Sequence, residues 1–124
     1  MKLGANLFAL ALGSCAMPPQ APQPQGPPLE LAGRIGGRPQ TCVTTTQMDV
    51  LRPSENAPHV LLYGTGRTVW ANNLGSCRFG RDDILVMQLY GSQLCRGDIV
   101  RSIDRSSRIP GPACVLNEFV PYRR

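Results

Sequence analysis

Residues 59–71 read HVLLYGTGRTVWA and decide the fold of this 124-residue chain. Two short runs of apolar and β-branched residues, 59–63 and 67–71, flank the turn Gly64-Thr65-Gly66. Two runs of this kind that are joined by a few residues containing glycine are typical of a β-hairpin. Glycine suits such a turn because it adopts positive φ angles without a steric cost. This stretch therefore predicts a hairpin.

Further strand signals lie on both sides of the hairpin. Val, Ile and Thr prefer strands because their branched Cβ restricts χ1, and turn residues separate the runs at short intervals. Residues 98–103 alternate, with Ile99 and Ile103 facing one way. We predict an all-β domain, a small disulfide-stapled β-roll or barrel of about six short strands, with one short helix at 89–95 as a variant. The expected strands are residues 42–46, 59–63, 67–71, 84–90, 98–103 and 113–119.

The N-terminal residues 1–14 have the order of a secretory signal. Lys2 is followed by an apolar run over residues 3–12, which is too short to span a bilayer of about 30 Å. Leu12-Gly13-Ser14-Cys15 looks like a bacterial lipobox, so we expect cleavage before Cys15 and lipidation of that cysteine. Ordinary cleavage after Ala16 and an unprocessed tail are the two alternatives.

Residues 15–40 are rich in proline, glutamine and glycine. Proline fixes φ and has no backbone N–H to donate, so dense proline opposes both helix and sheet. We expect a lipid-attached, disordered, proline-rich tether here, followed by a single β domain over residues 41–122. A proline-rich ligand for a partner domain is the alternative.

Four of the five cysteines remain once Cys15 is assigned to lipid attachment, and an even number favours disulfides. Small exported domains use disulfides because their cores are marginal. Zinc ligands usually come in close pairs, which these cysteines do not form, so we expect no metal. Three pairings are possible, and we favour a local bridge nested inside a bridge between the first and last strands, namely Cys77–Cys95 inside Cys42–Cys114.

Arginine supplies the positive charge of the chain, which carries +5 in total. Removal of residues 1–14 takes away Lys2, the one lysine, and leaves twelve arginines against eight acids. The arginines are scattered, without the cluster and interleaved aromatics that nucleic-acid binding requires, so we expect no nucleic-acid partner. The densest set is Arg101, Arg105 and Arg108. If the domain binds a phosphate-bearing anion, we expect it to bind there.

Catalytic constellations are not apparent in the sequence. His59 is the one histidine, and no G-x-S-x-G motif accompanies it. We expect no catalytic residue and no cofactor. Tyr63, Trp70 and Tyr90 are the aromatic residues that could line a binding surface, although aromatics on short strands more often belong to the core.

Four segments, each carrying one cysteine, have familiar spacings. They are residues 41–43, 70–77, 94–100 and 112–119. Together they resemble a family of small exported proteobacterial proteins that is defined only as a domain of unknown function. The chain departs from that pattern at Arg78, where proline would be expected. The resemblance supports the disulfide framework and highlights Asn72 and Asp98, which we expect to cap turns or satisfy buried backbone groups rather than to contact a ligand.

The sequence therefore predicts an uncharacterised lipoprotein of the bacterial cell envelope, facing the periplasm. Its partners would be the membrane, through lipid on Cys15, and an unknown envelope protein or ligand. Residues 16 and 17 carry no aspartate that would argue for inner-membrane retention, so we favour the outer membrane. We expect a non-enzymatic binding or structural module; a soluble periplasmic ligand-binding or inhibitor module that uses the hairpin of Tyr63 and Trp70 is the alternative.

Overall fold

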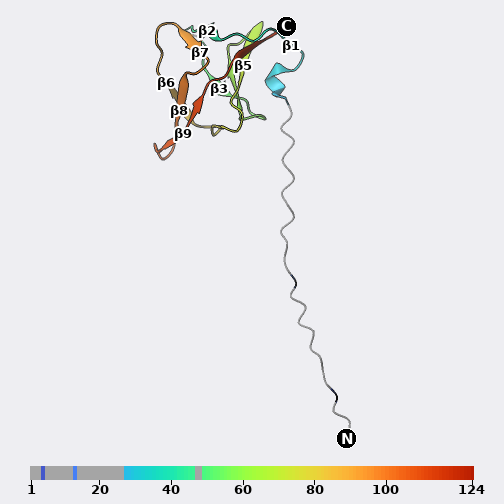
Figure 1. Cartoon of the computed structure of the whole chain (residues 1–124), viewed down its shortest axis with the longest axis vertical. Coiled ribbons are helices and arrows are strands. Elements are labelled where there is room, and N and C mark those ends of the chain that lie inside the picture. The colour runs from blue at the N-terminus through green and yellow to red at the C-terminus, as the bar shows by residue number, and fades with distance from the viewer. Residues whose placement is uncertain (1–3, 5–12, 14–26, 47–48) are drawn as a thin grey trace.

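The computed structural model describes Gly4, Gly13 and residues 27–46 and 49–124. Cys15 and nearly all of the predicted signal sequence lie outside these residues. The described part is an all-β domain with one turn of 3-10 helix, η1, which confirms the predicted fold class (Figure 1). Its elements, in chain order, are η1 (Leu29–Leu31), β1 (Ile35–Gly36), β2 (Cys42–Thr44), β3 (Arg52–Pro53), β4 (Val60–Tyr63), β5 (Thr68–Asn73), β6 (Ile84–Met87), β7 (Gln93–Cys95), β8 (Ile99–Ile103), β9 (Pro110–Val115) and β10 (Phe119–Arg123).

The predicted hairpin is confirmed and forms the centre of the largest sheet. β4 and β5 pair antiparallel, with Tyr63 opposite Trp70. Gly64 and Gly66 have φ angles of 90° and 87°, which residues with a Cβ rarely adopt. The full sheet has five strands in the order β1-β10-β5-β4-β3, all antiparallel.

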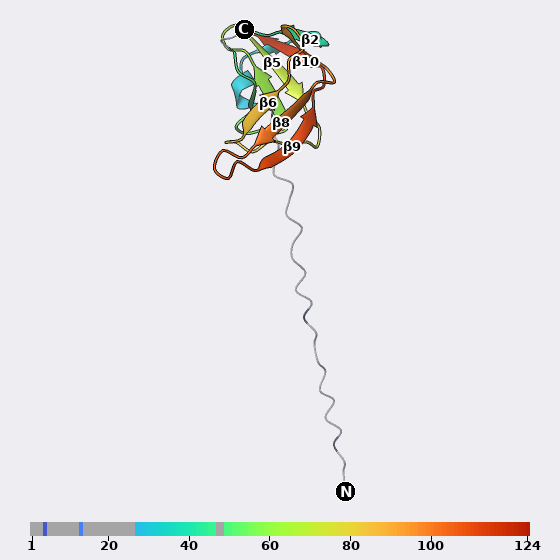
Figure 2. The same cartoon turned by 90° about the vertical axis from the view of Figure 1, so that its left-hand side faces the viewer.

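Two smaller sheets pack beside the five-stranded sheet. One has the order β6-β8-β9 and the other pairs β2 with β7. In Figure 2 the strands of the three-stranded sheet lie side by side across the front of the molecule. The described strands form three separate sheets that do not close into a barrel.

The five-stranded sheet is buried on both faces at β4, all four residues of which are buried, while the edge strand β1 is exposed. Leu61 and Tyr63 face the main core. There they pack with Phe119 of β10 and with Val100 of the three-stranded sheet. Val60 and Leu62 face a second cluster on the opposite side, where Leu31 packs. A central strand that is buried on both faces reads as a continuous apolar run, and residues 60–63 have that pattern.

Residues 27–34, which we call the strap, cover this second face. Glu30 accepts hydrogen bonds from the Ser54 hydroxyl at 2.8 Å and from the Glu55 backbone N–H at 2.9 Å. Asn56 accepts a bond from the Leu29 N–H and donates one to the Pro27 carbonyl, both at 2.9 Å. The predicted tether was therefore too long. Its residues 27–34 pack on the domain because Leu31 covers the apolar side chains of Val60 and Leu62.

The disulfides join Cys42 to Cys95 and Cys77 to Cys114, so the pairing that we favoured from the sequence is wrong. The physical reason is the pairing of β2 with β7, which places Cys42 directly opposite Cys95. Residues 93–95 were not expected to form a strand. The predicted disulfide framework of these four cysteines stands, with a different connectivity.

Two further predictions near the ends of strands are wrong. The helix variant at 89–95 is replaced by β7, and the single strand predicted at 113–119 is two strands, β9 and β10. β10 also continues through Pro121. The Pro121 carbonyl accepts a bond from Gly37 N–H at 2.7 Å, on the side where β1 has ended. The backbone N–H and C=O of one strand residue point to the same side, so an N–H at Pro121 would also point toward β1 and away from β5. The lack of an N–H at this proline therefore removes no hydrogen bond between β10 and β5.

Candidate functional site

A group of neighbouring exposed apolar side chains lies on one side of the three-stranded sheet. Successive residues of a strand point to opposite faces, and in β8 the exposed Ile99 and Arg101 alternate with the buried Val100 and Ser102. Residues opposite each other in a sheet share a face. The pairing of Arg101 with Val86 and of Ile99 with Val115 therefore extends this surface over all three strands. We call the side that carries Val86, Ile99, Arg101 and Val115 the outer face.

The outer face is uncovered in the described part of the chain. Val86, Ile99 and Val115 are 43%, 48% and 59% exposed. Single exposed apolar side chains are ordinary, but these three are neighbours across the register of one sheet. Contiguous apolar surface of this kind marks interaction sites.

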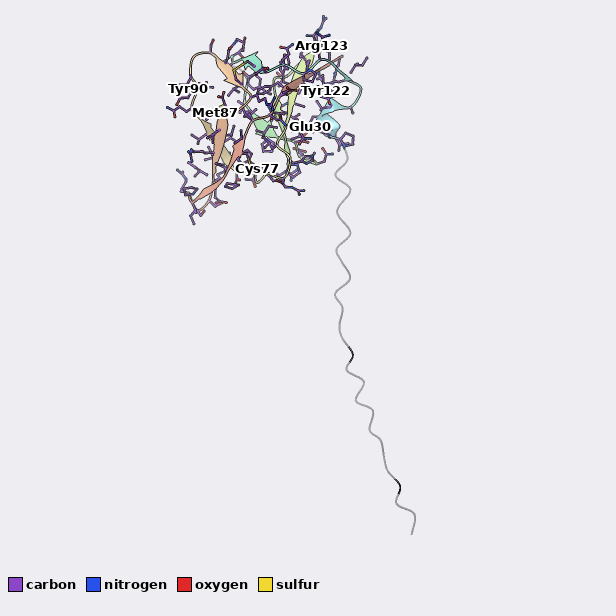
Figure 3. All side chains as sticks on the ribbon, viewed as in Figure 1. Glu30, Cys77, Met87, Tyr90, Tyr122 and Arg123 are labelled. Atoms are coloured by element: carbon purple, nitrogen blue, oxygen red, sulfur yellow. A yellow bond between two sulfur atoms is a disulfide. The ribbon has the colours of Figure 1, made fainter. Side chains whose placement is uncertain are left out.

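A cleft of about 560 Å³ lies at one end of the outer face. Tyr90, which is 81% exposed, and Arg101 supply polar groups beside the apolar side chains of Val86 and Ile99. A guanidinium next to an apolar floor can bind a carboxylate or phosphate that has an apolar neighbour. Figure 3 shows Tyr90 and Met87 on one side of the domain, with Glu30 and Tyr122 on the opposite side.

Of the three aromatic residues predicted to line a binding surface, Tyr90 alone is strongly exposed. Tyr63 is only 4% exposed and its hydroxyl accepts a hydrogen bond from the Thr46 N–H at 2.8 Å, so its assignment to a surface is wrong. Trp70, opposite Tyr63, is half-buried and packs against the main core. The reason is position, because the hairpin of β4 and β5 lies in the middle of a sheet covered on both faces.

Asn72 and Asp98 have the structural roles that were expected from the sequence. The fully buried Asn72 amide donates to the Asn117 carbonyl at 2.6 Å and accepts from the Asn117 N–H at 2.8 Å. The Asp98 carboxylate accepts a bond from the Cys95 N–H at 2.8 Å. Asp98 borders the cleft at the outer face but is occupied in a turn. Both predictions are confirmed.

A second cleft, of about 420 Å³, lies between the strap and the five-stranded sheet. Its floor is apolar, with Val60 and Ala71, and its rim carries His59 and Glu118. The Glu118 carboxylate forms an exposed ion pair with Arg96 at 3.4 Å. An exposed pair of this kind contributes little to stability. Within the described residues the His59 side chain takes part in no hydrogen bond, so no carboxylate orients it as a base.

Glu30 in the strap has a shifted pKa. Burial opposes ionisation of Glu30, but hydrogen bonds from the Glu55 backbone and the Ser54 hydroxyl outweigh it and hold the pKa of Glu30 below its ordinary value. At the densest arginine set, the Arg105 Nε donates to the Asp82 carbonyl at 3.4 Å. Arg108 adopts a positive φ of 61° in the turn between β8 and β9. This set therefore serves partly to shape a turn.

The described residues bring together no group of three histidine, cysteine or acidic side chains that could hold a metal ion. None of their helices is long and apolar enough to cross a membrane. Comparisons with protein-family models, with curated proteins and with solved structures find no match for this chain. The family resemblance drawn from the sequence stays a prediction.

Proposed function

We propose that this chain is an exported, lipid-anchored protein of the bacterial cell envelope, and that its β domain is a non-enzymatic binding or structural module at the membrane surface. The two disulfides carry the proposal, because structural disulfides persist in oxidising compartments such as the periplasm. They use four of the five cysteines, and the fifth, Cys15, stands at the end of the lipobox.

The distance between anchor and domain is set by a short spacer. Eleven residues, 16–26, separate Cys15 from the strap. At about 3.1 Å per residue, an extended chain of this length would span about 34 Å. The domain would therefore work close to the membrane, within reach of other envelope proteins.

The outer face supports a binding role, since it carries exposed apolar side chains around Arg101, is uncovered in the described part of the chain and borders Tyr90. Aromatic residues and arginine are enriched in protein interfaces. The second cleft offers less support for a reaction, because the His59 imidazole at its rim has no hydrogen bond to an orienting carboxylate within the described residues.

Intact mass spectrometry of the chain purified from bacterial membranes tests the proposal. We expect a chain that starts at Cys15 and carries lipid, and reduction should add four hydrogen atoms from the two disulfides. The Cys15→Ala variant is the control and should lack the lipid. An unprocessed chain with all five cysteines as free thiols would refute export, and a chain that begins at Met17 without lipid would replace the anchored form by a soluble periplasmic one.

A non-enzymatic role is tested separately. The purified protein should not turn over envelope substrates such as peptidoglycan fragments or phospholipids. Turnover that a single polar substitution at His59 abolishes, without loss of folding, would make the chain an enzyme.

A further inference from the structure

The free edge of β6 differs from the other strand edges of the described domain. Natural sheets protect their edges with prolines, charges or short strands, since an open edge can pair with another chain. β9 carries Pro110 and Pro112, β3 is two residues long and contains Pro53, and β1 is also two residues long. β2 and β7 have three residues each. β6 has four residues, all apolar, and no such protection.

The absence of protection extends beyond β6 itself. Residues 84–90 read ILVMQLY and contain no charge, no proline and no glycine. β6 pairs with β8 alone, and no described backbone group of β6 is hydrogen-bonded to another element. Its outward N–H and C=O groups are therefore available to a further strand.

We propose that β6 is the contact between two copies of this chain, which pair their β6 strands antiparallel about a two-fold axis at Val86. A two-fold axis perpendicular to a sheet places one residue opposite itself and keeps both outer faces on the same side. Val86 then lies opposite Val86 of the second copy, and Leu85 lies opposite Met87. The two three-stranded sheets become one six-stranded sheet, with Val86, Ile99 and Val115 of both copies on the same outer face.

The charges around β6 favour a second copy of the chain as the occupant. Self-pairing brings like charges together wherever a strand is charged, but the paired residues 84–88 carry none. Arg101 lies opposite Val86 on β8, so the two copies of Arg101 are three strand spacings apart, about 14 Å. That distance exceeds the screening length of about 8 Å at physiological ionic strength. A register centred on Leu85 would place Asp83 opposite Met87 within the paired strands, whereas in the Val86 register Asp83 lies outside the paired residues 84–88.

The pairing does not depend on the lipid anchor, so its failure and the failure of the proposed function are distinguishable. Where the anchor is present, it would confine the chain to a surface and raise its effective concentration. A small edge-to-edge contact that is weak in solution would then be well populated.

Cysteine cross-linking of the full chain tests the pairing. Cys15→Ser removes the extra thiol, and Val86→Cys places one new thiol on the axis. The matched control is Val115→Cys, which lies on the same outer face at comparable exposure but on the proline-bearing strand β9. Under mild oxidation we expect the Val86→Cys chain to form a disulfide-linked dimer about tenfold faster than the control. Equal rates for the two variants, or a ladder of higher oligomers, would overturn the proposal.

A second pair of variants guards against effects of the new thiol. Val86→Lys places two ammonium groups at the axis, whereas Val115→Lys adds the same charge away from it. Both positions are exposed, so the melting temperatures of both variants should stay near that of the parent. In sedimentation equilibrium at up to 100 µM, the parent and Val115→Lys should dimerise and Val86→Lys should remain monomeric. A parent chain that is monomeric throughout, or dimers that persist in Val86→Lys, would contradict the proposal.

Discussion

The five-stranded and three-stranded sheets differ in how their faces are covered. β4 is buried at every residue, because the smaller sheets cover one face of its sheet and the strap covers the other. β8 alternates between exposed and buried residues, and its exposed side is the uncovered outer face. Neighbouring apolar side chains that stay exposed on a sheet face do not contribute to the core. They are available to contact a partner.

Two aromatic residues show the difference between covered and uncovered surface most clearly, because one is fully buried and the other is largely exposed. Phe119, which has no exposed surface, packs in the main core, whereas Tyr90 is 81% exposed. Phe119→Ala should lower the free energy of unfolding by about 3–5 kcal/mol, from lost transfer energy and the cavity left behind. Tyr90→Ala should change it by no more than about 0.5 kcal/mol. Urea unfolding followed by circular dichroism measures both, and equal losses would break the distinction between the two sheets.

The buried polar contact of the five-stranded sheet gives the next effect. Asn72→Ala removes both hydrogen bonds to the Asn117 backbone and leaves the N–H and C=O of Asn117 without a partner. The expected loss is about 2–3 kcal/mol, since buried groups without partners are costly. The control is Asn73→Ala, which lies next in the strand, is exposed and loses one bond to Gly75 N–H. If Asn73→Ala destabilises the chain as much as Asn72→Ala does, the role assigned to Asn72 is wrong.

The strap should be the pH-sensitive cover of the five-stranded sheet. The pKa of Glu30 is lower in the folded chain than its ordinary value of 4.5, so the ionised form is the one that stabilises the fold. That stabilisation is present above the ordinary value and is lost as the pH falls through the folded-state pKa. Glu30→Gln should therefore have a lower melting temperature than the parent at pH 7, and the difference should shrink as the pH falls below 4.5.

Differential scanning fluorimetry across this range measures the effect of Glu30. Asp49→Asn is a suitable control, because the exposed Asp49 carboxylate accepts a hydrogen bond from the Thr46 hydroxyl and does not contact the strap. A difference between Glu30→Gln and the parent that stays constant down to pH 3 would show that the charge of Glu30 does not hold the strap.

The smallest effect is expected on the outer face. Ile99→Thr and Val115→Thr replace exposed side chains that no described element covers. Each should change the free energy of unfolding by no more than about 0.5 kcal/mol. Chemical denaturation of the two variants measures this, and a loss above 2 kcal/mol in either would mean that the outer face contributes to the core.

The sequence predicted the local pieces of the fold and not their long-range pairing. The hairpin was predictable because Gly64 and Gly66 mark a turn between two apolar runs, and the side-chain alternation of β8 was visible in Ile99 and Ile103. The disulfide connectivity depends on β7, which has only three residues. A strand this short carries no periodicity from which to predict it.

The misplaced residues have related causes. Tyr63 was assigned to a possible binding surface because it is an aromatic residue next to the hairpin turn, although the continuous apolar run of residues 60–63 is the pattern of a strand that is buried on both faces. The strap was included in the tether because its flanking prolines and glycines resemble a linker. The strap is held by Leu31, which packs against β4, and by Glu30, which binds Ser54. Both partners are distant in the sequence, so these contacts could not be predicted from the residues of the strap alone. Tyr90 was correctly expected to be available at a surface, and the structure adds the sheet face beside it.

Hydrogen exchange at two protein concentrations tests the central claim, that the outer face and edge of β6 are free for a partner while the five-stranded sheet is closed. Full chain at 1 µM and at 100 µM should show the same slow exchange in residues 60–63. Residues 84–88 should become more protected at the higher concentration, because their outward N–H groups pair with the second copy. Protection of residues 84–88 that is independent of concentration, or a concentration effect confined to residues 60–63, would contradict the account.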